Sequence, residues 1–178
     1  KRGFRVPPVS LKDLRELTET RCWINELGLR KSIARGDLAW EESVLLAHHR
    51  LSRTPPFLPD THDVSPEWEH RHRAFHDSLI ASCGSHWICE FSAMLFDLAG
   101  RYRHLSAEME DHRDFVDEHK AMMDAVIARD ADLAVELLTS HVSRTSEIVT
   151  LAETEMQMTN EMDAARPNAL FSLTPHKK

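Results

Sequence analysis

The stretch that decides the fold is residues 65–82, SPEWEHRHRAFHDSLIAS. Ser65 followed by Pro66 predicts a helix start, because serine caps free N–H groups and proline fits the first helical position. The helix is expected to cover residues 66–82 and to end before Gly84. Residues three and four apart lie on one face of such a helix. On that face are Trp68, His72, Phe75, His76 and Leu79. Histidines and apolar residues therefore share the side that should face a core.

Helical periodicity continues on both sides of this stretch. Ser10 with Asp13 three residues later predicts a capped helix start, and Gly36 is expected to end that helix. The inner side of this first helix would carry Leu14, Leu17, Ile24 and Leu27. The expected helices cover residues 10–35, 37–51, 66–82, 86–104, 109–128 and 130–155, with one proline-rich loop at 52–65. We therefore predict an all-α fold, an antiparallel bundle of six to seven helices.

Both ends of the chain depart from the bundle pattern. Residues 3–6, Gly-Phe-Arg-Val, are short, basic and strand-like, and two prolines follow them. Residues 156–178 contain two further prolines and end in two lysines, which is typical of a frayed tail. We expect a helical domain over residues 10–155, a remnant of another domain with its linker at 1–9, and a C-terminal tail at 156–178.

Composition narrows the class of protein. The chain has 178 residues, 42% of them apolar and 29% charged, which suits one globular domain. Its net charge of −7 argues against this segment gripping a nucleic-acid backbone by itself. No apolar run is long enough to cross a membrane, and the start lacks the apolar core of a signal peptide. Three cysteines without C-x-x-C spacing predict reduced core thiols in a cytoplasmic protein.

Four of the twelve histidines fall where a bundle core should be. His72 and His76 are one turn apart, His119 lies in line with Phe115, Met122 and Val126, and His141 lies in line with Leu133, Leu137 and Ile148. Imidazoles from three helices can share one divalent transition metal, zinc first, with nickel, iron, cobalt or manganese as alternatives. The competing interpretation is that each histidine is a core residue bonded to a neighbour, as single inward histidines usually are.

A metal site with open positions could also bind a small ligand, and carboxylates are its natural partners. A cationic side chain could hold the other end of a dicarboxylate. The candidate residues for effector binding are Arg21, Asn25, Tyr102 and either Arg101 or Arg103. Each arginine has a competing interpretation as a solvated surface residue, and the tyrosine as a core residue.

These residues resemble the effector domain, called FCD, of the FadR branch of GntR-type transcription regulators. That family has Asp-x-x-x-His on one helix and single histidines on two later ones. The matching segments here are His72–His76, residues 118–125 and His141, and residues 2–6 are similar to the wing end of the preceding winged helix. The resemblance covers residues 3 to about 152 and includes Arg21. Two positions depart from it: His72 replaces the usual aspartate, and Asn25 stands where glutamate is common.

The resemblance implies a homodimeric regulator, in most cases a repressor, that binds a palindromic operator through a winged helix outside this segment. A small carboxylate would bind the metal and the arginines and change the arrangement of the two DNA-binding domains. The run from Trp68 to Arg103 looks closest to a carbon-starvation branch of the family with relatives that respond to glutarate, so a glutarate-like dicarboxylate is the expected effector.

Two other functions remain open from the residues alone. A helical metal-dependent hydrolase would need a general base beside the metal, and helical spacing gives neither Glu69 nor Asp77 a clear inward position. The chain contains none of the common catalytic fingerprints, so we do not expect an enzyme. The other alternative is a bundle that senses nothing, with histidines that are purely structural.

Overall fold

Seven helices follow one another in the part of the chain that the structure describes. The structure is a computed structural model, and it describes residues 10–61, 63–109 and 115–164. In chain order the helices are α1 (Leu11–Arg35), α2 (Leu38–Ser52), α3 (Pro66–Ile80), α4 (His86–Leu98), α5 (Gly100–Met109), α6 (Phe115–Ile127) and α7 (Ala131–Ala164). The predicted all-α bundle is confirmed. The strand-like segment expected at residues 1–9 and residues 165–178 of the expected tail lie outside the described residues.

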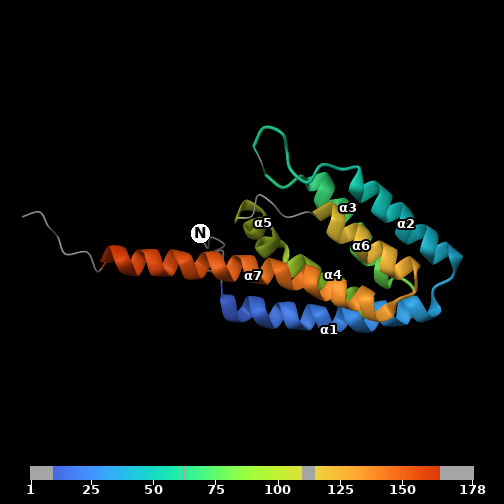
Figure 1. Ribbon diagram of the computed structural model, residues 1–178. Helices are drawn as coiled ribbons and strands as arrows, with labels where there is room; N and C mark the ends of the chain where they lie inside the picture. The colour runs from blue at the N-terminus through green and yellow to red at the C-terminus, as the bar shows by residue number, and fades with distance from the viewer. Residues whose placement is uncertain (1–9, 62, 110–114, 165–178) are drawn as a thin grey trace, which may run out of the picture.

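The helices are arranged around α1 and α7, which run side by side along the length of the molecule (Figure 1). Helix α3 packs against α1, α2 and α4, while α6 packs against α2 and α7. Helix α7 also contacts α5 and extends beyond the other helices at its C-terminal end (Figure 1). None of the described helices is both long and apolar enough to cross a membrane.

The helix starts are set by the capping residues that the sequence predicted. The side chains of Ser10, Asp37 and Ser65 accept hydrogen bonds from backbone N–H groups in the first turns of α1, α2 and α3. Gly36 ends α1, but with an extended backbone (φ −62°) and not the left-handed conformation usual for a C-terminal glycine. A Cβ at Gly36 would lie 2.0 Å from the Trp40 ring, so the close approach of that ring requires glycine here.

The expected helix at 86–104 is divided at Ala99 into α4 and α5. The helical periodicity of residues 86–104 is continuous, so nothing in the sequence indicated this break. Near the break, the Phe96 carbonyl accepts a hydrogen bond from Arg103 Nη1 at 2.7 Å. The last helix is longer than expected and continues to Ala164, because no glycine or proline interrupts residues 131–164.

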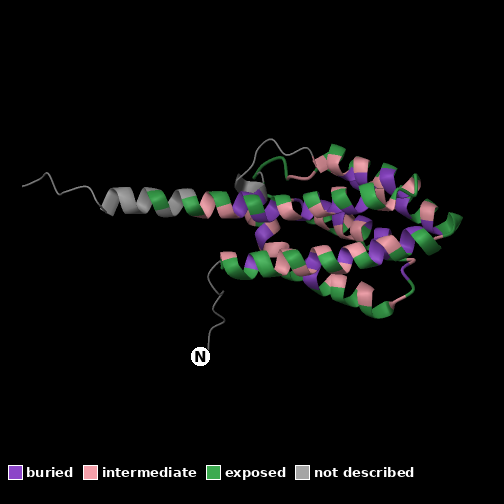
Figure 2. Ribbon diagram, turned by 60° about the horizontal axis from the view of Figure 1, so that its bottom comes forward, coloured by how far each residue is buried: buried purple, intermediate pink, exposed green. Residues whose placement is uncertain are grey.

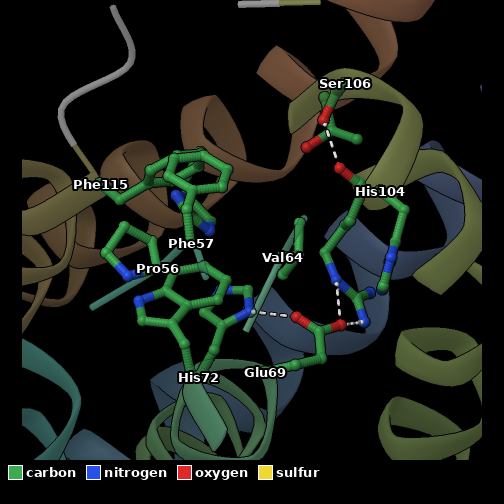
Figure 3. Close-up of a pocket in the computed structure, with 12 residues that line it drawn as sticks. Pro56, Phe57, Val64, Glu69, His72, His104, Ser106 and Phe115 are labelled. Carbon is green, nitrogen blue, oxygen red and sulfur yellow. Dashed lines mark hydrogen bonds and ion pairs between the residues drawn. The ribbon is translucent and has the colours of Figure 1, made fainter. Parts of the chain in front are cut away.

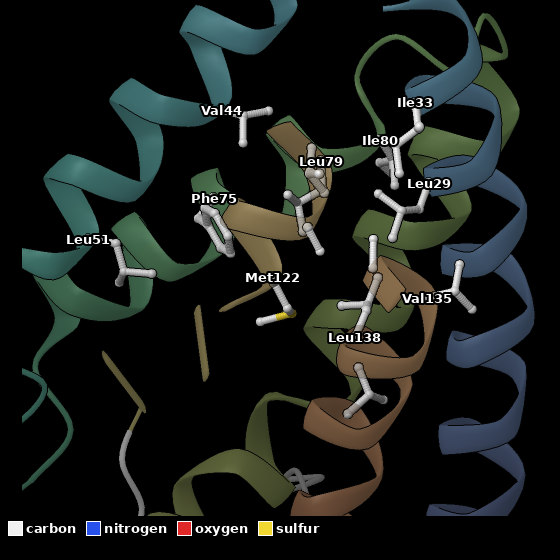
Figure 4. Packing of buried hydrophobic residues seen from close by; sticks show 14 of the residues in the cluster. Leu29, Ile33, Val44, Leu51, Phe75, Leu79, Ile80, Met122, Val135 and Leu138 are labelled. Atoms are coloured by element: carbon white, nitrogen blue, oxygen red, sulfur yellow. The ribbon is translucent and has the colours of Figure 1, made fainter. Parts of the chain in front are cut away.

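The core lies between α1, α2, α3, α6 and α7 (Figure 4). Its most buried members include Leu29, Val44, Phe75, Leu79, Met122 and Val126. A smaller cluster of Leu14, Tyr102 and Val149 joins α1, α5 and α7. The predicted inner side of α1 was partly wrong, since Leu27 is 46% exposed whereas Arg21 and Asn25 are buried. Figure 2 shows the buried positions turned toward the neighbouring helices.

Candidate metal centre and effector pocket

Four imidazoles meet inside the bundle, from α3, α6 and α7. One ring nitrogen from each of His72, His76, His119 and His141 lies within 4.8 Å of the others. Ring centroids are 4.6 Å apart for His72 and His76, and 4.7 Å apart for His119 and His141. Three of the four residues are buried and His76 is half-buried. The structure therefore brings together the whole set that helical spacing selected.

Two of these rings are held by acceptors outside the cluster. The Nδ1–H group of His119 donates to the Phe115 carbonyl one turn earlier in α6. His141 Nδ1 lies 2.6 Å from Glu118 Oε2, so a neighbouring carboxylate holds this ring. A hydrogen bond from Nδ1 puts the lone pair on Nε2, and such bonds commonly orient histidines that bind metals.

Two of the three histidines of α3, His72 and His76, contact each other directly. His72 Nε2 and His76 Nε2 are 2.9 Å apart, which is hydrogen-bonding distance. The His72 ring also stacks on Trp68, with centroids 4.6 Å apart and an angle of 18°. On its other side, His72 Nδ1 lies 3.6 Å from Glu69 Oε2, slightly beyond a hydrogen bond. Packing against Trp68 thus limits how far this ring can turn.

The His72 and His76 imidazoles are uncharged at neutral pH, because the pKa of each is lowered well below its ordinary value. Burial lowers the pKa of His72 well below its ordinary value, and the nearby His76 adds to the effect. Burial also lowers the pKa of His76 well below the ordinary value, with His141 and His119 as the next causes. Neutral imidazole is the form that binds a metal ion.

This donor set fits a divalent transition metal. Metal–nitrogen bonds of about 2.1 Å place two imidazole nitrogens about 3 to 4 Å apart around one ion, close to the spread found here. His72 Nδ1 is buried and has no hydrogen-bond partner among the described residues, which shows a polar cluster that the protein does not fully satisfy. Four imidazole nitrogen donors suit zinc and the later transition metals better than magnesium or calcium, which prefer oxygen.

Arg21 brings a positive charge into the same region. Its side chain is buried, and its guanidinium carbon lies 5.6 Å from the centre of the Phe96 ring, which also contacts His72 and His76. Burial lowers the pKa of Arg21 to about 10, and Arg103 adds to the effect, so the group stays charged at neutral pH. No hydrogen bond or ion pair links Arg21 to another described side chain. A buried cation in this state is costly unless an anion joins it.

The other predicted effector residues are spread more widely. Asn25 is buried one turn from Arg21, and its Oδ1 accepts a hydrogen bond from Ser92 Oγ at 2.9 Å. Tyr102 belongs to the smaller apolar cluster, where Arg101 lies over its ring at 5.0 Å. None of these residues, nor Arg21, is among the residues that line the pockets beside the histidines.

Arg103, the alternative to Arg101, does reach the site. Its guanidinium carbon lies 3.8 Å from the centre of the Phe96 ring, and its Nε donates to Glu69 Oε1 at 3.0 Å. Glu69 thus stands between Arg103 and His72, although helical spacing had given it no clear inward position.

A small pocket opens beside His72 and His141 (Figure 3). Its walls come from the loop before α3 and from α3, α5, α6 and α7. They are Pro56, Phe57, Val64, Trp68, Glu69, His72, Arg103, His104, Ser106, Phe115, His141 and Thr145. The lining is mostly apolar with a few convergent polar groups, as in small-molecule sites. Figure 3 shows the Glu69 carboxylate pointing toward His72 at one side of this pocket.

Sequence reasoning missed the two carboxylates that support the histidines. Glu69 could have been found, because it precedes His72 by three residues on one helix. Glu118 had no local signal, since its partner His141 is 23 residues away on another helix.

Comparisons with known proteins agree with this fold. Residues 16–144 match the family described as the FCD domain. The chain is 38% identical over 153 residues to an uncharacterized HTH-type transcriptional regulator, BphR, of Paraburkholderia xenovorans, covering 83% of this chain and 61% of the relative. It is 35% identical over 148 residues to the HTH-type transcriptional repressor GlaR of Escherichia coli, covering 79% of this chain and 66% of that protein.

A solved structure supports the same fold. A GntR family transcriptional regulator from Pseudomonas syringae superposes with a TM-score of 0.70 at 19% identity, covering 87% of this chain and 62% of the other. The chain spans less than two thirds of the length of each of these relatives. The family match covers well over half of the chain. The chain therefore belongs to the FCD domain family found in GntR-type transcriptional regulators.

Proposed function

We propose that this domain senses a small carboxylate and thereby controls DNA binding by a winged-helix domain outside this segment. The observation that carries the proposal is the buried Arg21 guanidinium, which is charged, makes no hydrogen bond or ion pair with an acidic side chain among the described residues, and lies close to four converging imidazoles. An anionic ligand would relieve the cost of that burial.

His72, His76, His119 and His141 would hold a divalent transition metal, most suitably zinc, with nickel, iron, cobalt or manganese as alternatives. Such an ion would offer a coordination position to one carboxylate oxygen of the effector. Glu118 holds His141 in place for this task, and the Phe115 carbonyl does the same for His119.

Arg21 would pair with the second carboxylate of a dicarboxylate such as glutarate, and Asn25 would add a hydrogen bond. Arg103 is already bound to Glu69, so an effector carboxylate that reaches it must compete with that ion pair. The apolar walls from Trp68, Phe57 and Phe115 suit the methylene chain between two carboxylates.

A ligand can shift a regulator between two states only if it binds one of them more tightly. About 1.4 kcal/mol of difference suffices for a tenfold change in operator affinity. One charge-assisted contact to Arg21 made in a single state supplies this amount. Because one relative is a repressor, we propose that the intact form of this protein also represses transcription.

The first test is metal analysis of the natively purified domain together with a thermal-shift series of small carboxylates. We expect near-stoichiometric transition metal and a higher melting temperature with a dicarboxylate, because a ligand that binds only the folded state stabilises it by mass action. The dicarboxylate should be recovered unchanged, since a sensor does not consume it. Metal-free protein that no carboxylate stabilises would refute the proposal.

The proposal includes a homodimer, and the outer face of α4 supports one. Four large apolar side chains follow one another there at spacings of four, three and four: Trp87, Phe91, Met94 and Leu98. Trp87 is 67% exposed and Leu98 is 55% exposed, over a stripe about 16 Å long. Contiguous exposed apolar surface of this kind commonly marks a protein interface.

We expect the double substitution Phe91→Glu and Met94→Glu to convert a dimer, about twice 20.5 kDa, into a monomer. Burying two carboxylates in an apolar interface is unfavourable, whereas both side chains stay solvated in the monomer. Light scattering after size exclusion measures the mass, and Glu90→Gln on the same helix is the matched control. A double variant that stays dimeric would place the interface elsewhere.

A further inference from the structure

Two of the three cysteines face each other across the turn between α3 and α4. The Sγ atoms of Cys83 and Cys89 are 3.7 Å apart, which is van der Waals contact between two thiols. A disulfide requires about 2.05 Å, so a shift of less than 2 Å would close the bond. We propose that Cys83 and Cys89 are a modification site that forms an internal disulfide on exposure to a peroxide. This proposal is independent of the metal and the effector.

The local backbone fixes this arrangement. Cys83 lies in the turn after α3, Ser85 caps α4, and Cys89 follows in the first turn of α4. Gly84, between them, has φ +75°, and a Cβ there would lie 2.5 Å from the Arg35 guanidinium. The positive φ favours glycine at this turn, which returns the chain so that the two sulfurs meet.

The two thiols have unequal access to solvent. Cys83 is 1% exposed, and its thiol lies 3.4 Å from the Ser85 carbonyl. Cys89 is half-buried, so a molecule as small as hydrogen peroxide reaches it first. This asymmetry assigns Cys89 as the attacking sulfur and Cys83 as the sulfur that resolves the product.

The reaction balances with hydrogen peroxide as the only oxidant. The Cys89 thiolate attacks one peroxide oxygen, the O–O bond breaks, and the leaving hydroxide takes up the thiol proton to give water and a sulfenic acid. The Cys83 sulfur then attacks the Cys89 sulfur and forms the S–S bond. The sulfenic hydroxyl leaves with the Cys83 proton as a second water. Two thiols are oxidised and one peroxide is reduced to two waters.

The reaction should be slow at neutral pH. Burial raises the pKa of Cys89 to about 11, and the neighbouring Cys83 thiol adds to the effect. Only the thiolate attacks peroxide, so the rate should rise about tenfold for each pH unit between 7 and 9. The disulfide would therefore form during prolonged exposure to the oxidant but not during a brief one.

The experiment treats the intact domain with hydrogen peroxide and follows its mass and free thiols. We expect a loss of about 2 Da, a fall from three free thiols to one, and a peptide linking residues 83 and 89. Cys22, on α1, has no sulfur neighbour in the described part of the chain and is the internal control. Cys22→Ser should react as the parent protein does.

Cys83→Ser tests the assigned order of attack. Without the resolving sulfur, Cys89 should stop at the sulfenic acid, which dimedone traps and which does not accumulate in the parent protein. Intermolecular disulfides, equal loss of all three thiols, or a pH-independent rate would overturn the proposal. Peptide mapping of the parent protein decides the matter even if a variant fails to fold.

Discussion

Replacing His76 by alanine is expected to remove the metal from the domain and leave the helical bundle folded. His76 is half-buried on α3, and alanine is a good helix former, so the bundle should lose little stability. Residues that merely support ligands already change metal affinity by 10–100-fold, so loss of a ligand should weaken binding by at least about 100-fold. Elemental analysis gives the metal content, and far-ultraviolet circular dichroism gives the helicity. His141→Ala should behave in the same way.

Two further variants sharpen this test. His70→Ala lies on the same helix but is exposed, so it should keep the metal. Glu118→Gln leaves His141 in place but weakens the acceptor that orients it. Its metal affinity should therefore be about tenfold weaker than that of the parent, between the values for His70→Ala and His76→Ala. If His76→Ala and His141→Ala both lost their helicity, the four histidines would be structural residues and the proposed centre would be wrong.

Arg21→Met should act in opposite directions on stability and on binding. Methionine fills a similar volume without a charge, and replacing buried charged groups by apolar ones often stabilises a protein by about 1–4 kcal/mol. The free energy of unfolding of the ligand-free domain should therefore rise. Dicarboxylate binding should weaken about 100-fold, because a charge-assisted contact of roughly 2–3 kcal/mol is lost.

Thermal melting with and without glutarate measures both effects on one sample. The matched control is Arg15→Met, at an exposed position of the same helix, which should change neither quantity. A variant that melts lower than the parent without ligand, yet still responds to the dicarboxylate, would show that Arg21 serves packing and not the effector.

The positions of the four histidines could be predicted because each depends on local information. Helical spacing puts His72 and His76 on one face of α3, and apolar neighbours turn His119 and His141 inward on their own helices. Once three such faces point to one core, the imidazoles must meet. The helix starts were predictable for the same reason, since a capping side chain acts within one turn.

The remainder of the site depends on contacts between distant segments. Whether Arg101 or Arg103 turns toward the histidines depends on the break at Ala99, since two residues correspond to about 200° around a helix. No capping signal marked that break. The hydrogen bonds from His141 to Glu118 and from Arg103 to Glu69 join separate helices, so only the packed bundle reveals them.

The guanidinium of Arg103 connects the break between α4 and α5 to the residues beside the histidines. This group donates hydrogen bonds both to the Phe96 carbonyl at the end of α4 and to the Glu69 carboxylate beside His72. An effector carboxylate that bound Arg103 in place of these acceptors would leave the Phe96 carbonyl without this donor. The connection between α4 and α5 would then become less rigid when the pocket is occupied. Lysine, with one compact ammonium group, could not reach both acceptors with the same planar fork. The stiffness of this connection would then report whether the pocket is occupied.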